Sequence, residues 1–132
     1  MPAYKNDRYL EFVELIFHQI VRKLFGYDEY KLRIISRRQS ATGKRLILGY
    51  INFQKKTIAL DVLTPKTNKP KSINTLLRTL AHEIAHIQKP PYYQKYRGRM
   101  IVRQHYPAFY HQVDKNIIKI KKDPYFSQYF RS

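Results

Sequence analysis

The segment His82-Glu83-Ile84-Ala85-His86 constrains the fold of this chain more than any other feature of its sequence. It lies within residues 73–88, where apolar residues recur at the spacing of one buried helical face. Residues i and i+4 of a helix lie one turn apart on the same side, so both imidazoles can reach a single metal ion. The fold therefore has to carry these residues on a helix and bring a further ligand to it.

Glu83 is rotated by about 100° from His82 around such a helix, close enough to reach a water bound to the metal without being a ligand. Zinc lowers the pKa of such a water towards roughly 7, and a glutamate can take its proton during attack on a carbonyl. The pattern predicts a zinc site with His82 and His86 as ligands and Glu83 as the general base. The alternative is a solvated helix face that carries two histidines and binds no metal.

Catalytic zinc usually has three protein ligands and one water, so a third ligand is expected. Glu83 is the last glutamate of the chain, and no cysteine is present. The remaining candidates are His105, His111, Asp114 and Asp123. His105 comes just before Pro107, where a helix is expected to begin, and so it could project into the mouth of a cleft. We favour His105 and leave the other three open.

The chain has 132 residues, of which 43% are hydrophobic. This predicts one domain over residues 1–132, and we allow for a flexible tail over residues 121–132. Without cysteine, disulfides, zinc ribbons, iron–sulfur centres and thiol nucleophiles are excluded, so histidines and acids have to hold any metal. No apolar run is long enough to span a membrane, and the first residues lack a signal-like stretch. We expect an intracellular protein, in the cytoplasm or nucleus.

Hydropathy patterns predict an α+β fold. An N-terminal helix is expected from Asp7 to about Phe25, with Gly26 as its stop. Three strand-like runs follow over residues 30–36, 45–53 and 57–63, and the segment 37–44 between the first two has the composition of a turn. The short link between the last two runs favours a small, mainly antiparallel three-stranded meander.

The histidine-bearing helix should begin after Ser72, as its N-cap, and end before Pro90. Residues 92–104 are expected to be irregular or weakly helical. Pro107 can then open a C-terminal helix. The residues of this helix that would face the core are Val113, Ile117 and Ile120.

Lysine and arginine number 26 against 9 aspartates and glutamates, a formal charge of +17. Self-repulsion of this size costs stability, so a polyanionic partner such as nucleic acid is expected. Residues 92–106, YYQKYRGRMIVRQHY, interleave tyrosines with cations, which suits single strands because bases stack on rings and cations follow phosphates. We predict nucleic-acid contacts at four cations of this segment: Lys95, Arg97, Arg99 and Arg103. The alternative is that the tyrosines pack onto the sheet and the cations are solvated.

Further residues extend these predictions. The loop before the histidine helix could add phosphate contacts through Lys66, Lys69 and Lys71, and the tail repeats the aromatic and basic mixture at Tyr125, Phe126, Tyr129 and Phe130. A hydrogen bond to a developing oxyanion could come from one of four tyrosines: Tyr92, Tyr93, Tyr106 or Tyr110. A ligand histidine could be oriented by Asp61 or Asp114.

HEIAH, followed after 18 intervening residues by HYPAFYHQVDK, resembles the SprT-like zinc metalloproteases, which include the Spartan and Wss-type DNA–protein crosslink proteases. That family shows HExxH and then a histidine in a pattern like H-G-x-x-F, which His105 and Phe109 match. The order of elements is similar over roughly residues 8–120. The resemblance implies a zincin-like fold in which His82, His86 and His105 bind zinc. It also implies that Glu83 is the general base.

Two departures from that family stand out. Tyr106 occupies the place where the family usually has glycine, so the loop around the third ligand can differ. Many relatives carry an added zinc ribbon, which this chain cannot form without cysteine. Where such relatives would reach DNA through an added module, we expect this chain to use its charge of +17 instead.

The main hypothesis is a zinc-dependent endopeptidase, a monomer, that acts on DNA-bound or DNA-crosslinked proteins. Its partners would be a protein substrate and single-stranded or damaged DNA. A second hypothesis is a nucleic-acid-binding module with a structural, non-catalytic zinc site. A third is a zinc peptidase with no role at DNA, whose charge serves solubility or an acidic substrate.

Overall fold

The computed structural model describes residues 7–35, 49–63 and 69–130 of the chain. The fold is mixed α+β, as predicted, with three α-helices and two small sheets among the described residues. The chain divides into two compact units, Met1–Leu80 and Ala81–Ser132, and the division falls inside helix α2 (Ile73–Gln88). Whether both units form one domain, as expected from the sequence, stays a prediction.

The first unit begins with the expected helix. α1 (Asp7–Phe17) continues without a break into a π-helical segment, η1 (His18–Leu24). One apolar face of this helix is buried in the core, through five residues: Val13, Ile16, Phe17, Ile20 and Val21. Gly26, at φ +79°, adopts the left-handed conformation that ends helices, which confirms it as the stop. The Tyr9 hydroxyl donates to the Lys71 carbonyl at 2.9 Å and so ties the helix to the segment that precedes α2.

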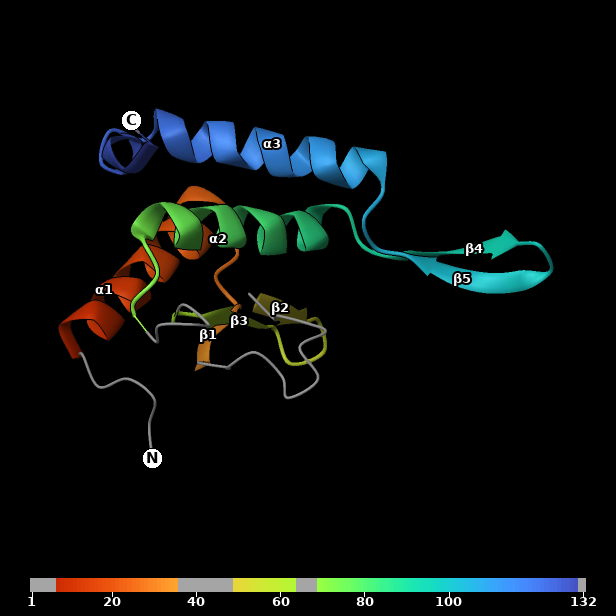
Figure 1. Cartoon of the computed structure of the whole chain (residues 1–132), viewed down its shortest axis with the longest axis horizontal. Helices are drawn as coiled ribbons and strands as arrows, with labels where there is room; N and C mark the ends of the chain where they lie inside the picture. Colours follow the sequence, from red (N-terminus) through yellow and green to blue (C-terminus); the bar gives the residue numbers. More distant parts are fainter. Residues whose placement is uncertain (1–6, 36–48, 64–68, 131–132) are drawn as a thin grey trace. The chain divides into compact units, whose positions relative to one another are not determined.

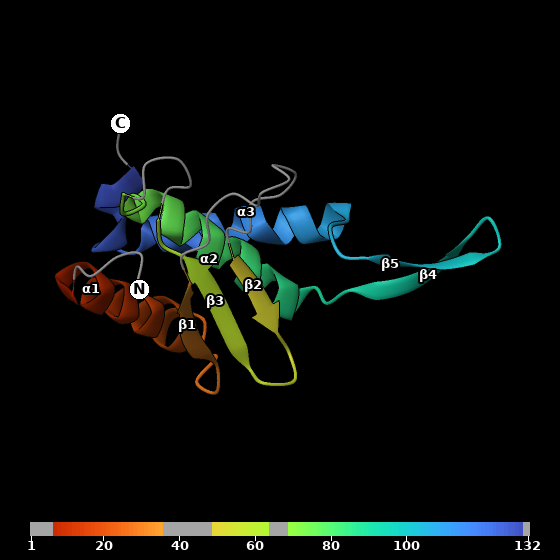
Figure 2. The ribbon, with the colours of Figure 1, turned by 60° about the horizontal axis from the view of Figure 1, so that its bottom comes forward.

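The sheet of the first unit differs from the expected meander. Its strands are β1 (Lys31–Ile35), β2 (Gly49–Asn52) and β3 (Thr57–Asp61), in the order β1-β3-β2 (Figure 2). β2 and β3 are antiparallel, as their short link predicts, but β1 and β3 are parallel, with Leu32 opposite Ile58. The mainly antiparallel meander is therefore wrong for one of the two pairings.

Burial explains this order. Residues 58–61 of β3 are all buried, whereas every residue of β2 is only half-buried. A strand that is buried along its length suits the centre of a sheet, with a neighbour on each side. The segment 37–44, predicted to be a turn, lies outside the described residues.

Helix α2 begins and ends where the sequence predicts. The Ser72 hydroxyl accepts a hydrogen bond from the backbone N–H of Thr75 at 3.2 Å, which confirms the N-cap. The helix stops at Gln88, two residues before Pro90.

The second unit holds the end of α2, a hairpin and helix α3 (Pro107–Lys122) (Figure 1). The hairpin consists of β4 (Tyr92–Tyr96) and β5 (Arg99–Arg103), paired antiparallel. The expectation of irregular or weakly helical structure over residues 92–104 is therefore wrong. The reason is the turn: Arg97 (φ 50°) and Gly98 (φ 78°) both take positive φ, as a two-residue type I′ hairpin turn requires.

Helix α3 begins at Pro107, as predicted, but its buried face is shifted from the expected one. Ile120 is buried, whereas Val113 and Ile117 are half-buried. Phe109 and Asn116 occupy the buried positions instead. The tail, for which we allowed flexibility, forms a 3₁₀ helix, η2 (Phe126–Phe130), with Phe126 buried. Among the described residues, no helix is both long and apolar enough to cross a bilayer.

Candidate metal centre

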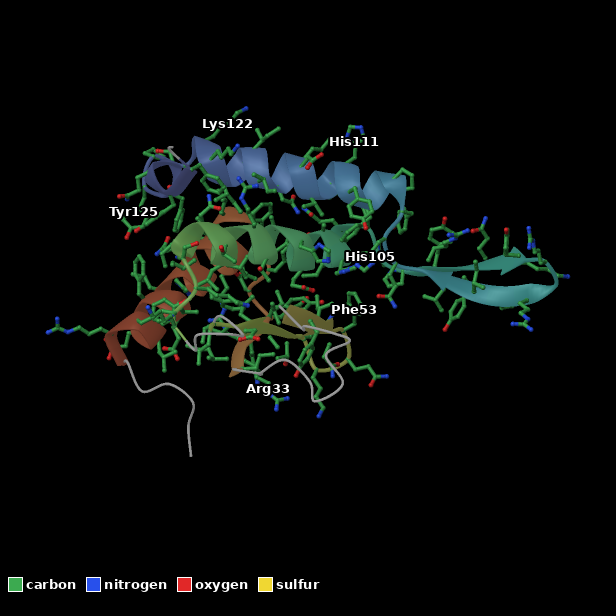
Figure 3. The ribbon with its side chains drawn as sticks, in the orientation of Figure 1. Arg33, Phe53, His105, His111, Lys122 and Tyr125 are labelled. Atoms are coloured by element: carbon green, nitrogen blue, oxygen red, sulfur yellow. The ribbon has the colours of Figure 1, made fainter. Side chains whose placement is uncertain are left out.

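Three histidines of the second unit converge. His82 and His86 lie one turn apart on α2. His105, labelled in Figure 3, lies between β5 and the start of α3. Each offers a ring nitrogen, and these three nitrogens all lie within 4.8 Å of one another. The prediction that His105 joins the two helix histidines is confirmed at the level of geometry. The three are close enough together to hold one metal ion.

The three imidazoles form a nearly equilateral triangle. Their ring centroids are 4.9 Å apart for His82 and His86, 5.2 Å for His82 and His105, and 5.0 Å for His86 and His105. Zinc–nitrogen bonds of about 2.1 Å at tetrahedral angles would place the ligand nitrogens about 3.4 Å apart. The separations of up to 4.8 Å exceed this by at most about 1.4 Å, which small side-chain rotations can close. A set of three imidazoles with no fourth protein ligand among the described residues fits a zinc site that keeps a position for water.

Phe109 is the aromatic support of this cluster. Its buried ring lies 5.0 Å from His82, 4.4 Å from His86 and 5.1 Å from His105, measured between centroids. It stacks on His86 at an interplanar angle of 29°. A phenyl ring cannot bind a metal, so it restrains the imidazole rings and keeps water from its own side of the cluster.

The three histidines differ in burial. His86 is buried, His82 is half-buried and His105 is exposed. Burial lowers the pKa of His86 to about 4, helped by its two histidine neighbours. Burial also lowers the pKa of His82, and His105 adds to the effect. Both helix histidines are therefore neutral at pH 7, the form that binds a metal.

Glu83, the residue after His82 on α2, is the only buried acid in the described part of the second unit, with 4% of its surface exposed. Burial raises the pKa of its carboxyl group to about 7 in the metal-free protein. A carboxyl group with such a pKa can take up and return a proton near neutral pH, which is what general acid–base chemistry needs. Its role as the general base stays a prediction.

A buried amide network holds α3 against the end of α2. Asn116 donates to the Ala81 carbonyl at 3.1 Å and to the Gln88 side-chain oxygen at 2.7 Å. It accepts from the Gln112 side chain at 3.0 Å. This network brackets the turns that carry the two helix histidines. Asn116 was not among the predicted residues, although a polar residue two turns after Phe109 on an apolar stripe indicates a buried hydrogen-bonding position.

Tyr106 anchors the segment that carries His105. Its hydroxyl donates to the Pro90 carbonyl at 2.9 Å, so its proton is already used. Its ring packs edge-on against Tyr92 at 4.9 Å. Among the predicted oxyanion donors, the exposed Tyr110 is the one whose ring contacts a ligand histidine, at 6.1 Å from His105. The exposed Tyr93 makes no ring contact within the described part of the chain.

The other candidate ligands lie elsewhere. Figure 3 shows His111 on the side of α3 that points away from the end of α2, and the His111 and Asp114 side chains are exposed. Asp123 accepts hydrogen bonds from the backbone of Tyr125 and Phe126, so it caps the turn before η2. Asp61, predicted as a positioning residue, belongs to the first unit, where it accepts from the Leu63 backbone. Within the described second unit, no carboxylate hydrogen-bonds to the three imidazoles.

The cations predicted to contact nucleic acid differ in exposure. The four of the hairpin, Lys95, Arg97, Arg99 and Arg103, are all exposed. In the loop before α2, Lys69 is exposed but Lys71 is buried, which contradicts its predicted phosphate contact. The Lys71 ammonium has no hydrogen-bond partner among the described residues. Lys66 lies outside them.

Comparisons with protein-family models, with curated proteins and with solved structures found no match to this chain. The chemistry of the residues and the geometry of the second unit are therefore what a functional proposal has to rest on.

Proposed function

We propose that this protein is a zinc-dependent endopeptidase that acts on DNA-bound or DNA-crosslinked proteins. The observation that carries the proposal is the convergence of His82, His86 and His105 beside the buried Glu83. The resemblance of these motifs to SprT-like metalloproteases, and with it a zincin-like fold, belongs to the same proposal.

The described part of the chain offers three ligands rather than four, and one of them, His105, is exposed. Structural zinc sites are closed by four protein ligands, whereas catalytic sites keep one position for water. This difference favours the catalytic role over the structural one. When bound, zinc supplies a Lewis acid that lowers the pKa of a coordinated water and polarises a carbonyl.

The chain's own residues would divide the remaining work. The three imidazoles hold the site in place and Phe109 supports their rings. Glu83 takes the proton of the attacking water and returns it to the departing amine, for which a pKa near neutrality is suited. The charge of +17 supports the DNA part of the proposal, because it concentrates the enzyme on a polyanion and on the proteins held there.

The decisive test is Glu83→Gln, with the exposed α1 residue changed by Glu14→Gln as matched control. The substrates are one protein in two forms, free and covalently crosslinked to a single-stranded oligonucleotide. We expect Glu83→Gln to bind zinc as the wild type does and to lose about 10²- to 10⁴-fold in cleavage rate, and Glu14→Gln to lose nothing.

Equal cleavage by Glu83→Gln and wild type would refute the catalytic assignment. If the wild type binds zinc but cleaves neither substrate, and chelation lowers its melting temperature sharply, zinc is structural. If both substrates are cleaved equally at all salt concentrations, the role at DNA is wrong.

A further inference from the structure

The β4–β5 hairpin is the part of the second unit with the least packing. Figure 1 shows it extending from the point where α2 ends and α3 begins. Of its ten strand residues, only Ile101 is even half-buried. Large side chains are exposed on both sides of the hairpin, Tyr96 by 49%, Tyr93 by 72% and Met100 by 65%. Large apolar side chains that are exposed together mark a surface that another molecule covers.

The strand register divides the hairpin into two faces. Residues opposite each other in an antiparallel pair point to the same side, and alternate residues share that side. The pairs Tyr92–Arg103, Gln94–Ile101 and Tyr96–Arg99 form one face, here called the Tyr–Arg face. The pairs Tyr93–Val102 and Lys95–Met100 form the other, here called the Met–Val face.

The Tyr–Arg face pairs each tyrosine with an arginine across the strands. At its outer end, Tyr96 lies opposite Arg99, and the Arg97 guanidinium lies 5.2 Å from the centre of the Tyr96 ring. Nearer the base, Arg103 donates to the Gln94 side-chain oxygen at 2.7 Å, which holds its guanidinium across the face. The hairpin contains four cations and no acidic residue.

We propose that the Tyr–Arg face binds single-stranded nucleic acid, with a base stacked on Tyr96 and phosphates at Arg97, Arg99 and Arg103. The ring supplies a stacking surface that tolerates any base, and guanidiniums on either side supply the phosphate contacts. A duplex keeps its bases inside its own stack, so Tyr96 would gain nothing from it. This inference names the DNA-contacting surface within the proposed function, but it does not depend on hydrolysis.

The Met–Val face provides an internal comparison. It carries Tyr93, which is more exposed (72%) than Tyr96 (49%). It also carries Lys95, which the sequence predicted as a nucleic-acid contact but which the register places on the face away from Arg99 and Arg103. Tyr93 has no arginine opposite it but Val102, and Lys95 lies opposite Met100. Attraction to charge alone would not distinguish the two tyrosines, whereas binding by the Tyr–Arg face depends on Tyr96 and not on Tyr93.

The test measures fluorescence anisotropy of a labelled thymidine 20-mer, alone and as a duplex, with the full chain carrying Glu83→Gln so that no cleavage interferes. Tyr96→Ala is compared with Tyr93→Ala, and Arg99→Gln with Lys95→Gln. Two further controls, Lys115→Gln and Lys122→Gln, remove exposed charges from α3.

We expect Tyr96→Ala to weaken single-strand binding roughly 5- to 150-fold, the range found for one stacked base, and Tyr93→Ala to weaken it less than about 2-fold. Arg99→Gln should reduce the dependence of log affinity on log salt by about 0.7, the value of one phosphate contact on a single strand. Lys95→Gln and the α3 variants should change it less.

Equal losses on the two faces would overturn the proposal, as would equal affinity for the duplex, or losses confined to the α3 variants. Because binding is measured in a protein that cannot use Glu83, failure here leaves the peptidase proposal intact. Likewise, a protein that cleaves no substrate would leave the proposed binding of single strands by the Tyr–Arg face intact. Circular dichroism and zinc content confirm that each variant is folded.

Discussion

The β4–β5 hairpin lies in the sequence between His86 and His105 of the histidine cluster, yet the side chains of the two regions differ in burial. In the cluster, three imidazoles pack against the buried ring of Phe109, and the neighbouring Glu83 is buried. In the hairpin, tyrosines and apolar residues are exposed among cations. A cluster held by its own packing has its shape before any ligand arrives, whereas the hairpin's side chains become packed only when something covers them.

The largest effect that this contrast predicts concerns zinc. His105→Ala removes the exposed member of the triangle and leaves two ligands on α2, so we expect stoichiometric zinc binding to be lost, with affinity reduced by more than about 100-fold. His111→Ala, which removes an exposed histidine of α3, should retain one zinc per chain. Zinc measured by mass spectrometry after dialysis against a weak chelator distinguishes the two. Equal zinc content in both variants would place the third ligand elsewhere.

The second prediction compares two aromatic-to-alanine changes in the zinc-free protein. Phe109→Ala deletes a fully buried ring, so it should lower the free energy of unfolding by about 3–5 kcal/mol. Tyr93→Ala deletes an exposed ring of the hairpin, so the free energy of unfolding should change by no more than about 0.5 kcal/mol. Urea unfolding followed by circular dichroism measures both. Similar changes in the two variants would show that the hairpin is packed in solution and would undo the contrast.

The sequence was informative wherever local rules decide the structure. The i, i+4 spacing of His82 and His86 depends only on helix geometry, and the helix ends at Ser72, Gly26 and Pro107 follow from capping and backbone preferences. His105 was also predicted, because the elimination of other ligands left few choices. These features need no knowledge of distant contacts.

The features that were missed depend on pairing or on context. The parallel pairing of β1 with β3 joins strands that are not consecutive, and no local signal reports it. The hairpin turn uses Arg97 at positive φ, where asparagine or aspartate would have been the recognised signal before glycine. The burial of Lys71 depends on what packs around it, which a loop composition of lysine and proline does not reveal.

The same comparison of buried and exposed side chains can be made for cations. Lys71 is a buried cation of the first unit, whereas the hairpin's cations are exposed. Burial lowers its pKa below the usual 10.5, although Asp61 opposes the shift. An amine whose pKa is lowered by folding holds more protons in the unfolded state, so its destabilising effect is largest at low pH. That effect fades as pH rises from the folded pKa towards 10.5.

Lys71→Met should therefore stabilise the protein by about 1–3 kcal/mol at neutral pH, since it removes a buried donor that has no hydrogen-bond partner among the described residues. The difference from wild type should shrink as the pH of the unfolding measurement rises. Lys95→Met, on the exposed hairpin, should give a small difference that does not vary in this way. A Lys71→Met variant that is less stable than wild type at pH 7 would mean that its ammonium makes a stabilising contact.

The smallest predicted effect concerns two glycine-to-alanine changes, one in the hairpin turn and one at the end of a core helix. Gly98 in the hairpin turn and Gly26 at the end of η1 have nearly equal φ, +78° and +79°, and a Cβ at either would meet nothing within 4 Å. Alanine at either position therefore costs only backbone strain, about 1 kcal/mol.

Gly26→Ala should lower the free energy of global unfolding by that amount, because the helix it ends is part of the core. Gly98→Ala should leave global unfolding and zinc affinity unchanged and should increase amide hydrogen exchange about fivefold over residues 92–103 alone, because a hairpin with so little packing opens locally. If Gly98→Ala instead lowers global stability as much as Gly26→Ala does, the hairpin unfolds together with the core, and its exposed residues are not independent of the histidine cluster.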